Sequence, residues 1–207
     1  MIIINKTSMD QKEQNSLNFI DLCCGIGGFH QALSQLGFNC VFASDINKDC
    51  KIIYENNYGI KPVGDLSKIE VSTIPDFDIL CAGFPCQPFS KSGDMKGFSD
   101  TRGTLFFHIC KIAEYHTPKY IILENVKNIV GHDKGNTWTT IKREILRIGY
   151  QTYEKPIVIN PLMFGVPQNR ERAIILCVRN DTKQYDYPLI RKVNKKELKC
   201  SLTDIIR

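Results

Sequence analysis

Cys86 is the residue in this chain best placed for nucleophilic chemistry. It lies in the segment Gly83-Phe-Pro-Cys-Gln-Pro-Phe-Ser90, directly after the apolar run from Asp78 to Ala82. A buried cysteine normally behaves as a small hydrophobic residue, whereas a loop that follows a strand presents its side chains to ligands. Pro85 and Pro88 restrict the backbone on either side of the thiol. The pattern therefore indicates a thiol held out for reaction rather than for packing.

A second group of residues has the pattern of a site for a nucleoside. Gly25-Ile-Gly27-Gly28 follows the first predicted strand and begins the first predicted helix. Glycines there let the backbone turn sharply and approach a ligand, and the free N–H groups of the helix bind anionic groups. His30 occupies the position of the third glycine in the dinucleotide pattern, which argues against a nicotinamide dehydrogenase. A tight strand–helix turn without a ligand is the alternative.

Two acidic residues strengthen the interpretation of the glycine segment. Asp45 ends the second predicted strand, where a carboxylate can accept the hydroxyl groups of a ribose. Asp65, in Gly64-Asp-Leu66, could bind an adenine amino group. Either acid alone would be interpreted as a helix cap or a solvated residue. The prediction of a nucleoside site therefore depends on the glycine segment and both acids together.

Four segments, taken in order, resemble the motifs of the C5-cytosine-specific DNA methyltransferase family. They are Phe19-Ile-Asp-Leu-Cys-Cys-Gly-Ile-Gly-Gly-Phe29, Gly83-Phe-Pro-Cys-Gln87, Glu124-Asn-Val126 and Gln168-Asn-Arg-Glu-Arg172. Longer stretches, at residues 96–107 and 132–136, are also similar to members of that family. The resemblance covers about residues 17 to 180.

The resemblance implies methyl transfer from S-adenosylmethionine to C5 of cytosine in DNA, as the modification arm of a restriction–modification system. The Cys86 thiolate would add to C6 of the base, which makes C5 nucleophilic. Glu124 would bind N3 and the exocyclic amino group, and Arg172 would bind the base carbonyl. Arg170 would orient the loop or a phosphate. Without the resemblance, Glu124 would be interpreted as a helix cap and the arginines as surface ion pairs.

The resemblance also assigns the cofactor site. The residues implied to bind S-adenosylmethionine are Cys23, Cys24, Gly25, Ile26, Gly28, Asp45, Ile46, Asp65, Leu66, Pro85 and Leu105. Cys23 stands where the family usually has phenylalanine, and Ile46 stands where a relative has tryptophan. Because an aromatic contact contributes about 0.5–1.5 kcal/mol, we expect weaker cofactor binding than in relatives that carry both rings.

Double-stranded DNA is the partner that the resemblance implies. C5 of a stacked cytosine is inaccessible, so the base has to be flipped out of the helix. The segment from Phe89 to Gly103 is predicted to close over the base, with glycine hinges and basic residues for phosphates. An ordinary surface loop is the alternative. The residues predicted to contact DNA or to form this loop are Gln87, Ser90, Ser92, Lys96 and Arg102.

Two other functions are compatible with the same motifs. One is C5 methylation of cytosine in transfer RNA, since related enzymes share the motifs around Cys86 and Glu124. The other is an inactive remnant or a regulatory subunit that binds the cofactor without catalysis. Intact Cys86, Glu124 and Arg172 argue against the remnant.

The predicted elements alternate between strands and helices, which favours an α/β fold with a mostly parallel sheet covered on both faces. The resemblance implies, more specifically, the Rossmann-like fold of S-adenosylmethionine-dependent methyltransferases. The motifs are expected to follow strands and to meet at the carboxyl edge of the sheet. The predicted strands are Leu17–Cys23, Cys40–Ala43, Ile79–Ala82, Tyr120–Leu123 and Ala173–Val178. The predicted helices are Phe29–Leu36, Asn47–Asn57, a segment from Leu105 through Ala113, and one from Trp138 to Ile148.

The chain divides into three predicted parts. Residues 1–16 form a polar tail, residues 17–180 a catalytic domain, and residues 181–207 a basic segment that begins a recognition region or linker. Family members continue past the motif that ends at Arg172 with a region that reads the DNA sequence. We therefore expect a second polypeptide to supply that region and the final motifs.

Composition sets the remaining limits. The chain has 207 residues, 43% of them hydrophobic, and a net charge of +5, which is compatible with nucleic acid but weak evidence alone. The nine cysteines contain no C-x-x-C pair and the four histidines show no metal spacing, so we expect no disulfide framework and no metal. No apolar run is long enough to span a membrane, and we expect a cytoplasmic protein.

Overall fold

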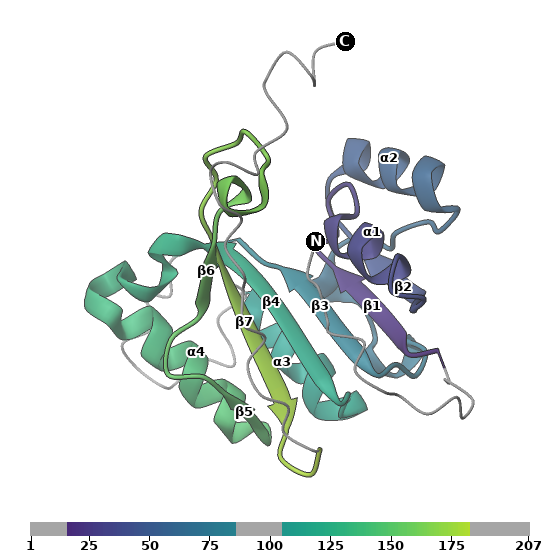
Figure 1. Cartoon of the computed structure of the whole chain (residues 1–207). Coiled ribbons are helices and arrows are strands. Elements are labelled where there is room, and N and C mark those ends of the chain that lie inside the picture. The colour runs from purple at the N-terminus through teal and green to yellow at the C-terminus, as the bar shows by residue number, and fades with distance from the viewer. Residues whose placement is uncertain (1–15, 86–104, 183–207) are drawn as a thin grey trace, which may run out of the picture.

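A seven-stranded sheet forms the centre of the molecule (Figure 1). The computed structural model describes residues 16–85 and 105–182. The strand order is β2-β1-β3-β4-β7-β5, and β6 also pairs with β7. The strands are β1 (Asn18–Leu22), β2 (Asn39–Ser44), β3 (Ile79–Gly83), β4 (Tyr120–Val126), β5 (Tyr150–Thr152), β6 (Ile157–Ile159) and β7 (Arg172–Arg179).

Strand direction separates the sheet into a parallel part and a reversed strand. β2, β1, β3 and β4 are parallel, whereas β7 runs antiparallel to β4. β5 and β6 are antiparallel to β7 and therefore run in the same direction as β4. The mostly parallel sheet is thus confirmed. The prediction missed β5 and β6, because three-residue strands are too short for an alternating pattern to emerge.

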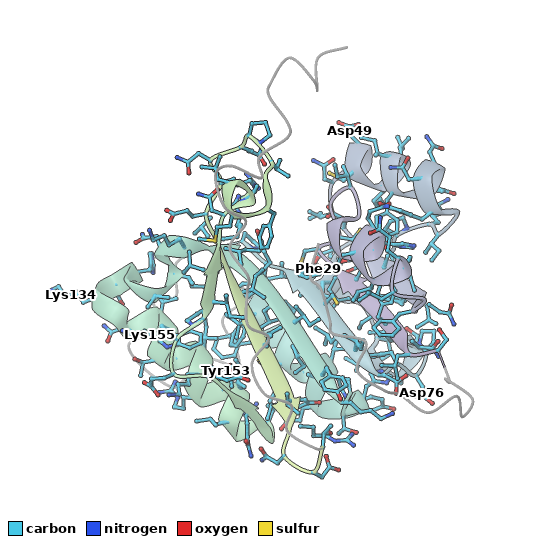
Figure 2. The ribbon with its side chains drawn as sticks, in the orientation of Figure 1. Phe29, Asp49, Asp76, Lys134, Tyr153 and Lys155 are labelled. Carbon is cyan, nitrogen blue, oxygen red and sulfur yellow. The ribbon has the colours of Figure 1, made fainter. Side chains whose placement is uncertain are left out.

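Helices cover both faces of the sheet, as predicted. The helices are α1 (Gly28–Ser34), α2 (Lys48–Tyr58), α3 (Leu105–His116) and α4 (Asn136–Arg147). The larger apolar cluster joins α3 and α4 to side chains such as Ile20, Leu80 and Leu123. Smaller clusters on the opposite face join α1 and α2 to Phe19 and Ala43. Phe29 of α1 lies on this second side (Figure 2). The two-sided burial explains why β3 and the segment Tyr120–Leu123 of β4 are continuous apolar runs.

Local sequence signals account for the helix ends. The Asn47 side chain accepts the backbone N–H groups of Asp49 and Cys50, and so caps the start of α2. Gly59 ends α2 in the left-handed conformation, with φ 70°. α1 ends at Ser34, two residues before the predicted Leu36, and α4 extends two residues further toward the N-terminus than predicted. Such shifts are small because the apolar spacing defines a helix better than its ends.

Among residues 16–85 and 105–182, no helix is both long and apolar enough to cross a membrane. The same part of the chain holds no group of three or more His, Cys, Asp or Glu side chains placed to bind a metal ion.

Candidate active site

The predicted site residues meet at one edge of the sheet. The carboxyl ends of β1, β3 and β4 carry the glycine turn, the segment Gly83–Pro85 and Glu124, respectively. Gly83 and Glu124 are register partners on neighbouring strands. The expectation that every motif follows a strand is wrong for Arg172, which begins β7. Because β7 is reversed, its first residue pairs with Val126 at the end of β4 and so reaches the same edge.

Glu124 and Arg172 form an ion pair at this edge. Arg172 Nε lies 2.6 Å from Glu124 Oε1, and both side chains are mostly buried. Arg172 Nη1 also donates to the Glu171 carbonyl oxygen at 2.9 Å, which holds the guanidinium in place. A carboxylate has four acceptor positions and a guanidinium five N–H donors, so both groups retain capacity for a ligand. The pair can therefore bind a planar ligand that presents neighbouring donors and an acceptor.

Gly83 lies close to both the carboxylate and the glycine turn. A Cβ atom built on Gly83 would lie 3.6 Å from Glu124 Oε2 and 3.8 Å from the Cys23 carbonyl oxygen. The predicted base-binding and cofactor-binding residues are thus brought together around the end of β3.

Asn125 anchors the start of the cysteine loop, a role that the sequence did not assign. Its Nδ2 donates to the Phe84 carbonyl oxygen at 2.8 Å, and its Oδ1 accepts the Val126 N–H at 2.8 Å. Asn125 is 2% exposed. Phe84 is also buried and packs against Phe106, with ring centroids 5.5 Å apart. An asparagine inside an apolar strand was the available signal, since a buried amide needs partners.

The predicted nucleophile and loop residues follow this anchor in the sequence. Pro85 is the last described residue before the gap at 86–104. The predictions for Cys86, Gln87, Ser90, Ser92, Lys96 and Arg102 fall outside the described residues and stay predictions.

The seven described cysteines are poor candidates for a nucleophile. Burial raises the pKa of each of their thiols, which disfavours the thiolate. For Cys23, burial first and then the charges of Asp45 and Asp21 raise the pKa to about 12. Cys81, Cys110 and Cys177 lie in the apolar core, in agreement with a packing role.

The glycine turn after β1 has the geometry that only glycine adopts readily. Gly25 and Gly27 have φ of 54° and 94°. A Cβ atom on Gly27 would lie 2.2 Å from the Tyr58 ring. Asp45 holds the other end of the turn: its Oδ2 accepts the Gly25 N–H at 2.8 Å, and its Oδ1 accepts the Asn47 N–H at 2.8 Å. Each oxygen of this carboxylate keeps acceptor capacity for a ligand.

The other predicted cofactor residues divide into exposed and buried positions. Ile26 and Ile46 are 60% and 75% exposed. A Cβ atom on Gly25 or Gly28 would meet no heavy atom within 4 Å, so open space lies beside the turn. Asp65 caps a short 3₁₀ helix by accepting the Ser67 N–H and hydroxyl groups, as its cap alternative anticipated. The remaining predicted positions are Cys24 and Leu66, which are buried, Cys23 and Leu105, which are half-buried, and Pro85, which is exposed.

A buried polar chain behind the turn escaped the sequence analysis. Asp21 is 1% exposed, and Tyr54 donates its hydroxyl to Asp21 Oδ2 at 3.4 Å. His30 Nδ1 lies 2.7 Å from the same hydroxyl, and the His30 ring stacks on Tyr58 with centroids 3.9 Å apart. Tyr58 donates to the Gly27 carbonyl oxygen at 3.1 Å. Burial raises the pKa of Asp21 to about 8. The chain therefore links a neutral buried carboxyl group to the turn.

Comparison with known proteins agrees with this arrangement. Residues 17–207 match the C-5 cytosine-specific DNA methylase family. The chain belongs to this family. Two members of the C5-cytosine methylase family show the similarity in detail. Type II methyltransferase M.HhaI of Haemophilus parahaemolyticus is 48% identical over 170 residues, which are 82% of this chain and 51% of that protein. Type II methyltransferase M.HaeII of Haemophilus aegyptius is 50% identical over 169 residues, which are 82% of this chain and 52% of that protein.

Solved structures of methyltransferases share the fold. The Dnmt2 methyltransferase of S. pombe has a TM-score of 0.69 and 27% identity, over 87% of this chain and 57% of that chain. The Entamoeba histolytica methyltransferase EhMeth has a TM-score of 0.66 and 25% identity, over 87% of this chain and 58% of that chain. This family member spans about half the length of the curated relatives it matches.

Proposed function

We propose that this chain carries the catalytic centre of a DNA (cytosine-5-)-methyltransferase, in the modification arm of a restriction–modification system. The observation that carries the proposal is the Glu124–Arg172 ion pair beside the anchored segment Gly83–Pro85, from which the chain continues directly to Cys86. Membership of the family and the Type II methyltransferases among the relatives support it.

The reaction divides among three side chains. The Cys86 thiolate adds to C6 of a flipped-out cytosine, and the electron pair of the C5–C6 bond moves toward C5 and the ring. Glu124 binds N3 and the exocyclic amino group, and Arg172 binds the base carbonyl, so that charge is stabilised as the adduct forms. After methylation, a water molecule takes the proton from C5, the electron pair of that C–H bond restores the C5–C6 double bond, and the electron pair of the C6–S bond leaves with the Cys86 thiolate. The Glu124–Arg172 contact holds both groups for these roles before a base arrives.

The turn from Cys23 to Gly28 and the acids Asp45 and Asp65 fit S-adenosylmethionine. Open space beside Gly25 and Gly28 leaves room for it, and the remaining acceptor positions of Asp45 suit the ribose hydroxyl groups. Asp65 Oδ1 accepts from Ser67, and Oδ2, which lies 3.8 Å from Lys68 Nζ, keeps acceptor capacity for the adenine amino group. The cofactor supplies an electrophilic methyl group when bound.

We also propose that sequence recognition depends on a region corresponding to the other half of the relatives, in the same or a second polypeptide. The matched relatives are about twice as long as the aligned part. Specific readout of DNA needs side chains that reach base edges in a groove, in addition to the residues that bind the flipped base.

Trapping a covalent adduct tests the catalytic proposal. DNA that contains 5-fluorocytosine cannot lose the C5 substituent as a proton, so the adduct with Cys86 should persist in denaturing gels when S-adenosylmethionine is present. The assay is run with and without a polypeptide that supplies the remaining half, and with transfer RNA as the competing substrate. Cys86→Ser is the control and should give no adduct.

The outcomes separate the candidate functions. Adduct and methyl transfer on transfer RNA alone would assign the RNA function instead. Cofactor binding without an adduct on either nucleic acid, even with the remaining half supplied, would assign a cofactor-binding regulatory role.

A further inference from the structure

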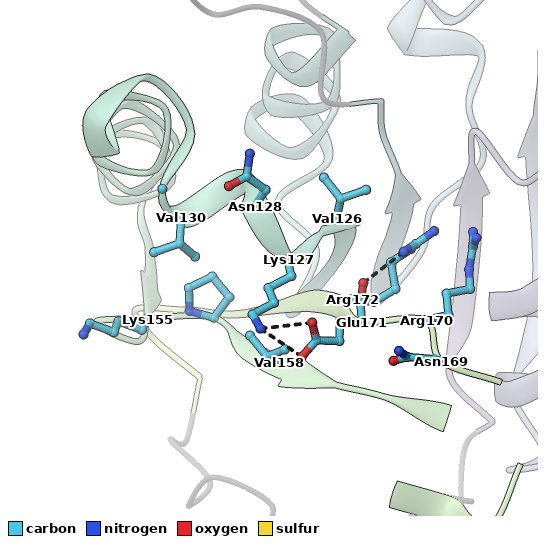
Figure 3. Close-up of a pocket in the computed structure, with 12 residues that line it drawn as sticks. Val126, Lys127, Asn128, Val130, Lys155, Val158, Asn169, Arg170, Glu171 and Arg172 are labelled. Atoms are coloured by element: carbon cyan, nitrogen blue, oxygen red, sulfur yellow. Dashed lines mark hydrogen bonds and ion pairs between the residues drawn. The ribbon is translucent and has the colours of Figure 1, made fainter. Parts of the chain in front are cut away.

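A positively charged groove lies beside the candidate active site (Figure 3). Its volume is about 810 Å³. It is bordered by the end of β4 with the short 3₁₀ helix Lys127–Val130, by the start of β6, and by the residues that precede β7. We call it the Lys127 groove. Its lining residues are Val126, Lys127, Asn128, Val130, Gly131, Lys155, Pro156, Val158, Asn169, Arg170, Glu171 and Arg172.

The groove carries an excess of positive charge, although two of its cations are paired: Lys127 with Glu171, and Arg172 with Glu124 outside the lining. Its lining contains four cationic side chains, and Glu171 is the one carboxylate among these described residues. Lys127 Nζ lies 2.9 and 3.0 Å from the two Glu171 carboxylate oxygens, so this pair is neutral. Lys155 and Arg170 add positive charge, and the Lys155 side chain points away from Glu171 (Figure 3). A groove with excess positive charge concentrates a polyanion along its length.

The walls between the cations suit the rest of a nucleic acid backbone. Val126 and Val158 supply apolar surface in front of the buried Pro156, and Val126 is 39% exposed. The amides of Asn128 and Asn169 are hydrogen-bonding groups of the kind that contact phosphate and sugar oxygens. A polypeptide that packed here would have to neutralise the same cations, whereas a phosphodiester chain carries a negative charge at every step.

The groove is continuous with the base-binding pair. Arg172 lines the groove and also contacts Glu124. We propose that the Lys127 groove binds the phosphodiester backbone of the strand that carries the target cytosine, without reading its sequence. This inference rests on the proposed function, because it takes the Glu124–Arg172 pair as the place of the base.

Salt-dependent DNA binding tests the groove directly. Fluorescence anisotropy of the full chain is measured with a short labelled DNA duplex between about 50 and 200 mM salt. Lys127→Ala and Lys155→Ala should each weaken binding, and the loss should be the same for duplexes of unrelated sequence. Each variant should also reduce the slope of log binding constant against log salt concentration by about 1. Glu171→Gln should have the opposite effect and tighten binding, because it removes the charge that neutralises Lys127.

Lys119→Ala is a matched control. Lys119 lies just before β4, at the opposite edge of the sheet from Lys127, and its Nζ pairs with Asp78 at 2.9 Å. The two lysines are about equally exposed, at 48% and 56%, and both pair with a carboxylate. Lys119→Ala therefore removes the same charge from the chain and should leave the salt dependence unchanged.

Two results would overturn the inference. One is a wild-type chain that does not bind the duplex at the low end of the salt range. The other is a salt dependence that is equal in wild type, both groove variants and the control, as expected if a polypeptide occupies the groove. Adduct formation at Cys86 is a separate readout. If the adduct forms but the groove variants bind DNA like wild type, only the groove proposal is refuted. If the groove variants change DNA binding as expected but no adduct forms, even with the remaining half supplied, only the catalytic proposal is refuted.

Discussion

At the scale of single residues, burial decides which titratable groups are charged. Asp21 lies in the core behind the glycine turn, where it is 1% exposed. Desolvation there disfavours the carboxylate, and this raises the pKa of Asp21 to about 8 from 3.8. The same effect keeps the thiol of Cys23 neutral. Burial of this kind disfavours the thiolate that a cysteine nucleophile needs.

The raised pKa of Asp21 predicts how stability depends on pH. Between pH of about 4 and about 8 the unfolded chain loses the proton that the folded chain keeps, so the free energy of unfolding decreases as pH rises. The variant Asp21→Asn has no titrating group at this position, so its free energy of unfolding does not decrease for this reason. We expect the melting temperature of the variant, relative to wild type, to rise steadily between those values in differential scanning fluorimetry. If the difference in melting temperature between variant and wild type stays constant across this pH range, the pKa of Asp21 is not raised.

Cys23 predicts a change in cofactor affinity. The family usually has phenylalanine at this position, and aromatic packing contributes about 0.5–1.5 kcal/mol. Cys23 has φ of 54°, and phenylalanine, like cysteine, is not β-branched, so we expect the backbone to tolerate the exchange. Cys23→Phe should tighten S-adenosylmethionine binding several-fold by titration calorimetry. An unchanged or weaker affinity would refute the packing argument.

At the scale of elements, two contacts between strands and loops assemble the site. Asn125 ties β4 to the segment after β3, and the reversal of β7 brings Arg172 to Glu124. Both contacts join residues more than 40 positions apart in the chain. The candidate site therefore depends on the sheet being complete from β3 to β7.

Asn125→Ala should destabilise the protein and disorder the approach to the nucleophile. The change leaves the buried Phe84 carbonyl and the Val126 N–H without partners, at about 1–3 kcal/mol. We expect a lower denaturation midpoint in urea together with loss of adduct formation. Asn136→Ala, at an exposed position at the start of α4, serves as the control and should change neither. Full activity in the Asn125 variant would contradict the anchoring role.

Arg172→Ala and Arg179→Ala compare the two ends of β7. Arg172 contacts Glu124 at the site edge, whereas Arg179 pairs with Asp181 at the opposite edge. Removing a preorganised charge partner of a reacting group costs roughly 10²–10³-fold in rate, so we expect that loss for Arg172→Ala in a methyl-transfer assay. Arg179→Ala should retain the wild-type rate. Equal rates in both variants would mean that Arg172 does not act on the base.

At the scale of the whole molecule, the sheet separates the apolar core from the candidate site residues. The apolar clusters fill the two faces, and the polar site residues collect at the carboxyl edge. The Lys127 groove extends that edge toward β6 and shares Arg172 with the Glu124–Arg172 pair. Under our proposal, a nucleic acid strand follows the groove to this pair.

Most of the elements could be predicted from the sequence, because β1 to β4 were visible as apolar runs. Residue type and local spacing were enough to select Cys86 and the glycine turn as candidates, whereas the prediction for Glu124 came from the resemblance to the family. The tertiary structure alone decided that β7 is reversed, that Arg172 meets Glu124, and that Asn125 anchors Phe84. Strand direction and buried partners depend on contacts between distant residues, and no local pattern encodes them.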